Sequence, residues 1–237
     1  MAIKAILFDK DGTLIDVNRT WIPIYRHMLA AEFQADDSEV TRLLQKAGYD
    51  AESDNFRAGS VLAGGTTRQL VNIWWPDADN AHRSATTTRI DTQYAPVARQ
   101  YLKPLLDLPP VFEALKTIGM RLGVGTNDSV FSATGQMQAL AIDHFFEAIL
   151  GADSVEVPKP SGQMVKRYAE LMELQCTEIA MVGDNTHDME EAHHSGAMAI
   201  GVLSGNAKRE HLEPLTDFIF DDVAALPAFF REHGHVL

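Results

Sequence analysis

The sequence predicts an α/β protein in which helices flank a mainly parallel sheet, with a helical domain inserted after the first strand. Three observations predict this class. Short apolar runs alternate with helix-like stretches over most of the chain. One long segment, residues 17–100, breaks that rhythm and holds helical patterns without a convincing strand. Polar clusters follow three of the apolar runs, where open parallel sheets bind their ligands.

Five apolar runs are predicted to form the strands. A strand that is buried in a parallel sheet reads as a continuous apolar run, because helices cover both of its faces. The first run is IKAILF, close to the N-terminus. The predicted strands are residues 3–8, 121–125, 179–182, 197–202 and 218–220.

The helices between these strands are predicted from their apolar periodicity and from their end signals. Pro109 suits the start of a helix, while Gly119 and Gly196 suit the position after a last turn. The predicted helices are residues 110–118, 130–141, 161–174 and 186–195.

The inserted segment is predicted to be a separate helical domain. Helical patterns cover residues 21–34 and 38–47, and all three tryptophans of the chain fall between residues 17 and 100. Trp74 and Trp75 suit a hydrophobic core, a domain seam or a homodimer contact. The predicted division is a core of residues 1–16 and 101–237 and an insertion of residues 17–100, with residues 96–110 leading back to the core.

Composition narrows the class of partner. The chain has 237 residues and a formal net charge of −13. Binding to nucleic acid or to anionic lipid needs clustered Lys and Arg, so we expect neither partner. Cys176 is the single cysteine, which excludes an intrachain disulfide and suits a reducing compartment, so we expect a cytoplasmic protein.

The first polar cluster, Asp9 to Thr13, suits phosphoryl transfer. One carboxylate would attack phosphorus and form an aspartyl phosphate, while a second would protonate the leaving oxygen. Asp9 and Asp11 can fill these two roles, and Gly12 permits a turn that a side chain would hinder. The alternative is an ordinary polar turn after a strand.

The cluster at residues 183–188 suits a metal site. Asp184 and Asp188 have the i, i+4 spacing that places two side chains on one helix face. Two carboxylates near Asp9 would form the hard oxygen site that Mg²⁺ prefers. The alternative is that both acids cap a helix N-terminus. His187, His193 and His194 are expected to form a solvated helix end.

Three further residues are candidates for binding the phosphoryl group. Thr126 and Asn127 follow a strand and would donate hydrogen bonds to it, although such residues also cap helices. Lys159, between two prolines, would supply a fixed cation for the phosphoryl oxygens or for Asp9. The alternative for Lys159 is an exposed loop.

In order, Asp9-x-Asp11-Gly12-Thr13, Thr126-Asn127, Lys159 and Gly183-Asp184-xxx-Asp188 resemble the four signature motifs of the haloacid dehalogenase-like hydrolase superfamily. The resemblance spans the whole chain and implies a Rossmann-like core with a cap domain. An insertion directly after the first motif is similar to the helical cap of phosphoglycolate phosphatase-like members. The third motif departs from the usual Lys-Pro-x-Pro, because Ser161 and Gly162 follow Pro160.

The resemblance also implies a role for each matching residue. Asp9 would be the nucleophile and a Mg²⁺ ligand, and Asp11 the general acid and base with its backbone carbonyl on the metal. Thr126 would bind the phosphoryl group, and Lys159 would stabilise its charge. Asp184 would ligate Mg²⁺, and Asp188 would support the metal waters or Lys159. Lys10 is expected to point away from the two acids.

The substrate is expected to be a small phosphorylated metabolite, with phosphoglycolate as the best single candidate. Cap residues that would read it are Arg57, Arg68 and the stretch from Gly64 to Thr67, in which Thr66 would bind the substrate. The alternative for this region is a surface loop with solvated arginines. Two other functions fit the same motifs: a phosphomutase acting on sugar phosphates, and a non-catalytic binding module.

Overall fold

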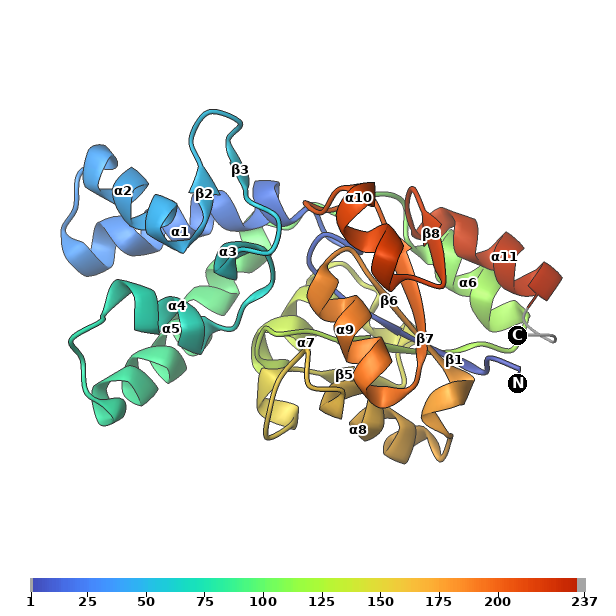
Figure 1. Cartoon of the computed structure of the whole chain (residues 1–237). Helices are drawn as coiled ribbons and strands as arrows, with labels where there is room; N and C mark the ends of the chain where they lie inside the picture. Colours follow the sequence, from blue (N-terminus) through green and yellow to red (C-terminus); the bar gives the residue numbers. More distant parts are fainter. Residues whose placement is uncertain (1, 234–237) are drawn as a thin grey trace.

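The computed structural model describes residues 2–233, so Met1 and residues 234–237 of the predicted core lie outside the described part. The chain forms two lobes, a helical cap and an α/β core (Figure 1). The core holds a six-stranded parallel sheet in the order β5-β4-β1-β6-β7-β8. Its strands are β1 Ala5–Phe8, β4 Arg121–Gly125, β5 Ala148–Leu150, β6 Ile179–Gly183, β7 Met198–Val202 and β8 Phe218–Phe220.

All five predicted strands are present, which confirms the predicted class. β5 was not predicted, because only three residues pair and they follow the helix-compatible sequence Phe145–Glu147. β5 pairs with β4 alone, at the edge of the sheet. A short edge strand needs little apolar sequence and therefore leaves a weak pattern.

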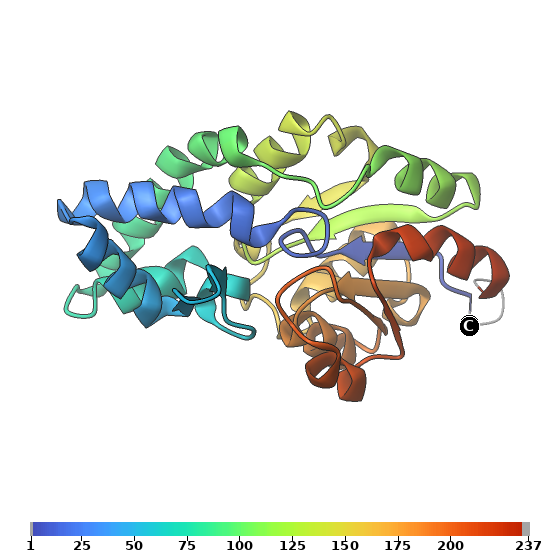
Figure 2. The ribbon, with the colours of Figure 1, turned by 90° about the horizontal axis from the view of Figure 1, so that it is seen from above.

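Helices cover both faces of the sheet (Figure 2). Side chains alternate along β1, so that Ile6 and Phe8 join a core with α6 and α11, while Ala5 and Leu7 join one with α8 and α9. The core helices are α6 Pro109–Thr117, α7 Val130–Ala139, α8 Gln163–Met172, α9 Thr186–Ser195, α10 Arg209–Leu212 and α11 Leu226–His233. Short 3₁₀ turns cover Asp143–Phe145, Ala152–Ser154, Cys176–Glu178, Glu213–Leu215 and Val223–Ala225.

The cap is helical with one small correction to the prediction. Its helices are α1 Val17–Phe33, α2 Asp37–Ala47, α3 Val61–Gly64, α4 Thr67–Trp74 and α5 Asn80–Tyr101. A two-stranded antiparallel hairpin, β2 Tyr49–Asp50 and β3 Asn55–Phe56, lies where no strand was expected. Each strand has only two residues, too few to show alternation.

The cap has its own hydrophobic core. Trp74 is buried there and donates from Nε1 to the Leu43 carbonyl at 3.0 Å, and the ring of Trp75 packs 4.8 Å from that of Phe33. α5 ends at Tyr101, and Arg99 near its end lies against Gly135 of α7. The last turn of α5 therefore rests on the core, near the predicted boundary. No helix in residues 2–233 is long and apolar enough to span a membrane.

Candidate active site

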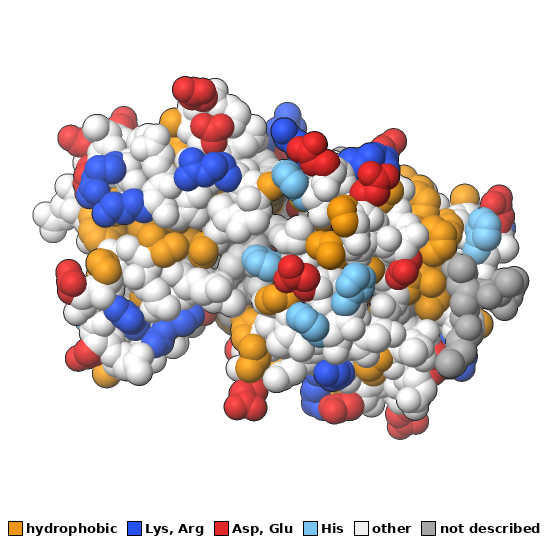
Figure 3. All heavy atoms as spheres, viewed as in Figure 1, with side chains coloured by type: hydrophobic (Ala, Val, Ile, Leu, Met, Phe, Trp, Pro, Cys, Tyr) orange, Lys and Arg blue, Asp and Glu red, His pale blue; other side chains and the backbone are white. Residues whose placement is uncertain are grey.

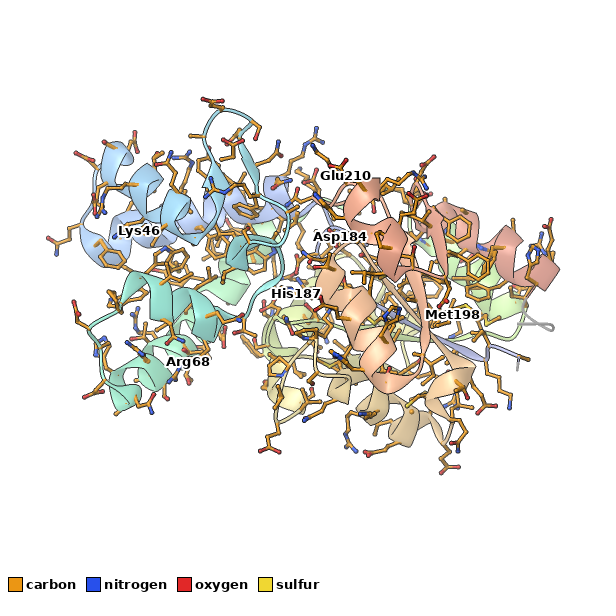
Figure 4. All side chains as sticks on the ribbon, in the orientation of Figure 1. Lys46, Arg68, Asp184, His187, Met198 and Glu210 are labelled. Atoms are coloured by element: carbon orange, nitrogen blue, oxygen red, sulfur yellow. The ribbon has the colours of Figure 1, made fainter. Side chains whose placement is uncertain are left out.

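The order of the strands reverses at β1, because β4 and β5 lie on one side of it and β6, β7 and β8 lie on the other. Because β4, β1 and β6 are parallel, their carboxyl ends meet at one edge, which is the switch point where such folds bind ligands. The loops after β1 and β4 carry Asp9 and Thr126, and the first turn of α9, which follows β6, carries Asp188. All three residues line one cavity between core and cap. Asp184 and His187 accordingly lie at the side of the core that faces the cap (Figure 4).

Lys159 reaches the bottom of this cavity from the loop that precedes α8. Its Nζ lies 2.7 Å from Asp9 Oδ1 and 2.6 Å from Asp188 Oδ1, and all three side chains are buried. Burial lowers the pKa of Lys159, but the charges of Asp188 and Asp9 outweigh burial and raise it. Lys159 is therefore a fixed cation and not a loose surface lysine, as its place beside Asp9 requires.

Asp9 is a buried carboxylate at the end of β1. Burial is the largest cause that raises its pKa, to about 7, against the lowering effect of Lys159. The charges of Asp188 and Asp11 raise the pKa of Asp9 further. Asp9 thus sits in an environment with surplus negative charge, and a bound cation would offset that charge.

Asp184 is a buried carboxylate with weak hydrogen-bond partners. Among residues 2–233 its oxygens accept two long hydrogen bonds, 3.3 Å from Asn206 N and 3.4 Å from Thr13 Oγ1. Burial, then the charges of Asp9 and Asp188, raise the pKa of Asp184 well above its usual value. Carboxylate oxygens of Asp9, Asp184 and Asp188 all lie within 4.8 Å of one another. This buried oxygen set fits a hard divalent cation such as Mg²⁺.

Two glycines make room for Asp184. Gly12 has φ +86°, and a Cβ there would lie 2.4 Å from Asp184 Oδ2. A Cβ on Gly205, in the loop after β7, would lie 1.8 Å from the same atom. Gly12 was predicted to permit the turn, and it does, with its carbonyl accepting a 2.8 Å hydrogen bond from Ser204 Oγ. Gly205 was not predicted, because no motif singles out its loop.

Asp11 is held from both sides. Its Oδ1 accepts a 2.6 Å hydrogen bond from Trp21 Nε1 of the cap, and its Oδ2 accepts one from Lys10 Nζ. The prediction that Lys10 points away from the acids is therefore wrong. Lys10 is fully buried, and Asp11 is one of its ion-pair partners. Sequence reasoning missed the roles of Lys10 and Trp21, because only the fold brings Lys10 to Gln136 and Trp21 to Asp11.

Lys10 also contacts residues of the next loop and helix. Its Nζ lies 3.4 Å from Asp128 Oδ2 and donates to Gln136 Oε1 at 2.8 Å. Burial lowers the pKa of Lys10, but Asp11 and Asp128 outweigh burial and raise it. A single buried cation therefore organises two of the cavity's carboxylates.

Thr126 and Asn127 both lie at the cavity, as predicted, but the Asn127 side chain makes more hydrogen bonds to the protein. Thr126 lines the cavity, and its hydroxyl accepts from Asp128 N at 3.2 Å. The Asn127 amide donates to the carbonyls of Gly64 at 2.9 Å and Lys159 at 3.1 Å, and accepts from Lys159 N at 3.1 Å. Asn127 therefore joins the cap to the Lys159 loop, and this use of its amide was not predicted.

Asp188 combines the two roles that the sequence left open. Its Oδ2 accepts a 3.0 Å hydrogen bond from Asn185 N at the start of α9, which is a capping contact. Its Oδ1 holds Lys159. His187, expected at a solvated helix end, instead lines the cavity, and its buried Nδ1 has no hydrogen-bond partner among the described residues.

Of the predicted cap binders, Arg57, Thr66 and Arg68 do not line the cavity. Arg57 is exposed and donates to the Gln45 carbonyl at 3.0 Å, because the β2–β3 hairpin turns it outward. Thr66 caps α4, and its hydroxyl accepts from Gln69 N at 3.2 Å. Arg68 donates to Ser84 Oγ and Asn80 Oδ1, away from Asp184 in Figure 4. Of the predicted stretch, Gly64, Gly65 and Thr67 line the cavity.

The cap side of the cavity is mostly apolar and aromatic. Trp21 stacks on Tyr25 with ring centroids 5.4 Å apart, and Tyr25 meets Trp74 edge-on at 5.7 Å. Asp91 of α5 is the carboxylate that the cap contributes. The apolar cap residues that line this side are Val17, Ile24, Met28, Leu62, Ala63, Leu70 and Ile90.

Comparison with known proteins agrees with this geometry. A family model described as a haloacid dehalogenase-like hydrolase matches residues 3–196. "Pyrophosphatase PpaX" of Bacillus mycoides is 25% identical and aligns with 99% of this chain and 100% of its own length. "Glyceraldehyde 3-phosphate phosphatase" of Methanopyrus kandleri is 26% identical over 93% of this chain and 91% of its own length. A solved structure described as a predicted phosphoglycolate phosphatase from Haemophilus somnus has a TM-score of 0.72 and 21% identity, covering 96% of this chain and 97% of its own.

Proposed function

The chain belongs to the haloacid dehalogenase-like hydrolases, and on this basis we propose that it is a phosphatase that forms an aspartyl phosphate on Asp9. Its substrates would be small phosphorylated metabolites. The observation that carries the proposal is the placement of Asp9 in the cavity, with Lys159 Nζ 2.7 Å from its Oδ1. A buried carboxylate beside a fixed cation suits attack on an anionic phosphoryl group.

The residues support a two-step reaction. In the first step the Asp9 carboxylate attacks phosphorus, the ester P–O bond breaks, and Asp11 gives a proton to the departing oxygen. In the second step Asp11 takes a proton from water, the water oxygen attacks phosphorus, and the Asp9 carboxylate is released with inorganic phosphate. Trp21 and Lys10 fix the orientation of Asp11, and both contacts are present in the structure.

Asp9 and Asp184 are the residues that would hold Mg²⁺, with Asp188 close to both. When it is bound, Mg²⁺ offsets the repulsion between these carboxylates and the substrate phosphate. Lys159 adds a second positive charge, and Asp188 keeps it in place at 2.6 Å. The Thr126 hydroxyl, which lines the cavity, would donate to a phosphoryl oxygen.

The identity of the phosphorylated substrate is a separate question from the reaction. Relatives named for pyrophosphate and glyceraldehyde 3-phosphate lie at similar distances from this chain, so their names do not choose between substrates. Phosphoglycolate, the candidate from the sequence, would require a cation for its carboxylate. Lys159 is the one Lys or Arg that lines the cavity among the described residues, and it contacts Asp9 and Asp188.

The proposal is tested by phosphate release from p-nitrophenyl phosphate in Mg²⁺ buffer, without any bisphosphate activator. We expect the wild type to be active, Asp9→Asn to lose at least about a thousandfold in kcat, and EDTA to abolish activity until Mg²⁺ is restored. Asp77→Asn, at an exposed cap position, is the control with the same change of charge.

Two outcomes would contradict the proposal. Full activity of Asp9→Asn would remove the covalent step, and full activity in EDTA would remove the metal. Release that depends on a bisphosphate would instead identify a phosphomutase. Circular dichroism of each variant separates lost chemistry from lost folding.

A further inference from the structure

The cap side of the cavity carries a charge pattern that selects the leaving group. Resting on the proposed phosphatase activity, we propose that the alcohol released by this enzyme carries a cationic amine, which Asp91 and the aromatic rings of the cap recognise. The substrate class is then the phosphate monoester of an amino alcohol.

Asp91 is a carboxylate in the cap wall of the cavity. It lies on α5, and its Oδ1 accepts a 2.6 Å hydrogen bond from Thr67 Oγ1. In residues 2–233 no ion pair reaches Asp91, and no protein donor reaches its Oδ2. A half-buried carboxylate without a cation is unfavourable, so a ligand cation would be stabilised there.

The cap's own cations are directed elsewhere. Arg89 pairs with Glu32, and Arg68 bonds Ser84 and Asn80. In Figure 4 Lys46 and Arg68 lie in the outer part of the cap, and Figure 3 shows Lys and Arg side chains on that outer surface. Among the described residues, no Lys or Arg of the cap lines the cavity, so an anionic leaving group would meet no positive partner on that side.

Aromatic rings complete a site for an ammonium group. Tyr25, Trp74 and Tyr94 line the cavity wall, and Tyr25 meets Trp74 edge-on. Trp21 supports Tyr25, because its ring stacks on Tyr25 and already has the Lys10 ammonium group 5.3 Å from its centroid. Ring faces attract cations, and aromatic groups beside a carboxylate are a recurring way to bind quaternary ammonium.

Tyr25 links Asp91 to the reacting centre. Burial, then the charges of Asp128, Asp11 and Asp91, raise the pKa of Tyr25 well above its usual value. Tyr25, Asp11 and Asp91 all line the same cavity. Because Asp9 and Asp91 line this one cavity, a substrate bound in it would have its phosphate at Asp9 and its amine at Asp91.

The same pattern disfavours anionic leaving groups. A carboxylate at the end of phosphoglycolate would meet Asp91 and apolar side chains, with no donor cation to offset the repulsion. An uncharged alkyl group would fit the apolar wall but would leave Asp91 without a partner. We therefore expect the order amine, then neutral, then anionic leaving group.

The test uses pairs of substrates that differ mainly in charge. O-phosphoethanolamine is compared with propyl phosphate, and phosphocholine with 3,3-dimethylbutyl phosphate, with phosphoglycolate as the anionic case. We expect kcat/KM for at least one amine to exceed that of its neutral isostere by about tenfold to a hundredfold, the size of one interaction with a charged group. Equal values within both pairs, or a preference for phosphoglycolate, would overturn the inference.

Variants then test the residue. Asp91→Asn is expected to reduce the amine-to-neutral ratio to about one, and Asp91→Lys to move the preference toward phosphoglycolate. Asp77→Asn, exposed in the same lobe, should leave the ratio unchanged. An unchanged ratio in Asp91→Asn would overturn the assignment. Failure of every substrate, p-nitrophenyl phosphate included, would instead contradict the proposed phosphatase activity.

Discussion

Lys10 shows how one buried side chain can determine the arrangement of a site. Its ammonium group is fully buried and contacts Asp11, Asp128 and Gln136. A lysine between two reactive acids gives no hint of these partners in the sequence, because two of them come from residues more than a hundred positions away. Asp11, the proposed general acid, is thus oriented by long-range folding and not by its own motif.

Lys10→Met should destabilise the protein strongly, because it leaves two buried carboxylates without their cation. We expect a loss of about 3 to 5 kcal/mol in the free energy of unfolding, measured by urea denaturation. Lys4→Met is the matched control, since Lys4 pairs with Glu178 on the surface at 2.6 Å, and its loss should cost at most about 1 kcal/mol. Equal losses in the two variants would contradict this account.

The raised pKa of Asp91 leads us to expect that the stability of the fold depends on pH. Burial is the largest cause that raises the pKa of Asp91, from 3.8 to about 6, while the Thr67 hydrogen bond lowers it. The folded state then binds a proton more tightly than the unfolded state, so stability falls as pH rises through about 6.

The comparison with Asp91→Asn isolates this effect. Between pH 4 and pH 7 the unfolding free energy of the wild type should fall, relative to that of Asp91→Asn, by up to about 3 kcal/mol. Urea denaturation at several pH values in EDTA measures the difference. A difference that stays constant with pH would show that Asp91 titrates normally.

At the scale of elements, the turn after β1 requires glycine at position 12 both for its positive φ and for the close approach of Asp184. Gly12 and Gly119 have nearly the same positive φ, +86° and +88°, but a Cβ on Gly119 would meet nothing within 4 Å. Substituting alanine should therefore cost each about 1 kcal/mol of backbone strain. Gly12→Ala alone should also displace Asp184.

Phosphate release distinguishes the two substitutions. Gly12→Ala should lose at least about a hundredfold in kcat/KM, since misplacement by about 1 Å can cost that much. Gly119→Ala should retain nearly full activity despite similar destabilisation. If both variants keep the same activity, Gly12 acts only through its backbone conformation.

The elements also show what sequence reasoning can and cannot reach. Five strands, the helices between them and the acids after β1 and β6 follow from apolar runs and from polar residues at strand ends. β5 and the β2–β3 hairpin were missed because two or three residues carry no period. Arg57 was misplaced because a hairpin of that size decides which way its side chain points. Trp21, Lys10 and Asp91 were missed because their contacts cross between lobes or helices.

For the whole molecule, Mg²⁺ binding should couple to folding, because the carboxylates that would bind it converge only in the native state. With Mg²⁺ at a hundred times its Kd, the wild type should gain about 2.7 kcal/mol and melt roughly 5 to 10 °C higher. Asp184→Asn should lose most of this shift, whereas Asp77→Asn should keep it. Differential scanning fluorimetry with and without Mg²⁺ measures both, and an equal shift in Asp184→Asn would place the cation elsewhere.

The two lobes meet through a few specific contacts. Asn127 of the core holds the Gly64 carbonyl at 2.9 Å, Asn18 of the cap donates to Asn206 at 2.7 Å, and Trp21 donates to Asp11 at 2.6 Å. Asn127 also bonds the backbone of Lys159, and Asp11 is the proposed general acid. Reaction geometry therefore depends on how the cap is seated.

The helix that carries Trp21 also carries Tyr25 one turn later, on the same face. Trp21 holds Asp11, the proposed proton donor, and Tyr25 lines the cavity where the alcohol would depart. Laboratory evolution toward new substrates would therefore meet a trade-off on α1, where any repacking that widens the pocket also disturbs turnover. Libraries directed at α4 and α5 avoid that linkage, and they are where new selectivity should be obtained with the chemistry intact.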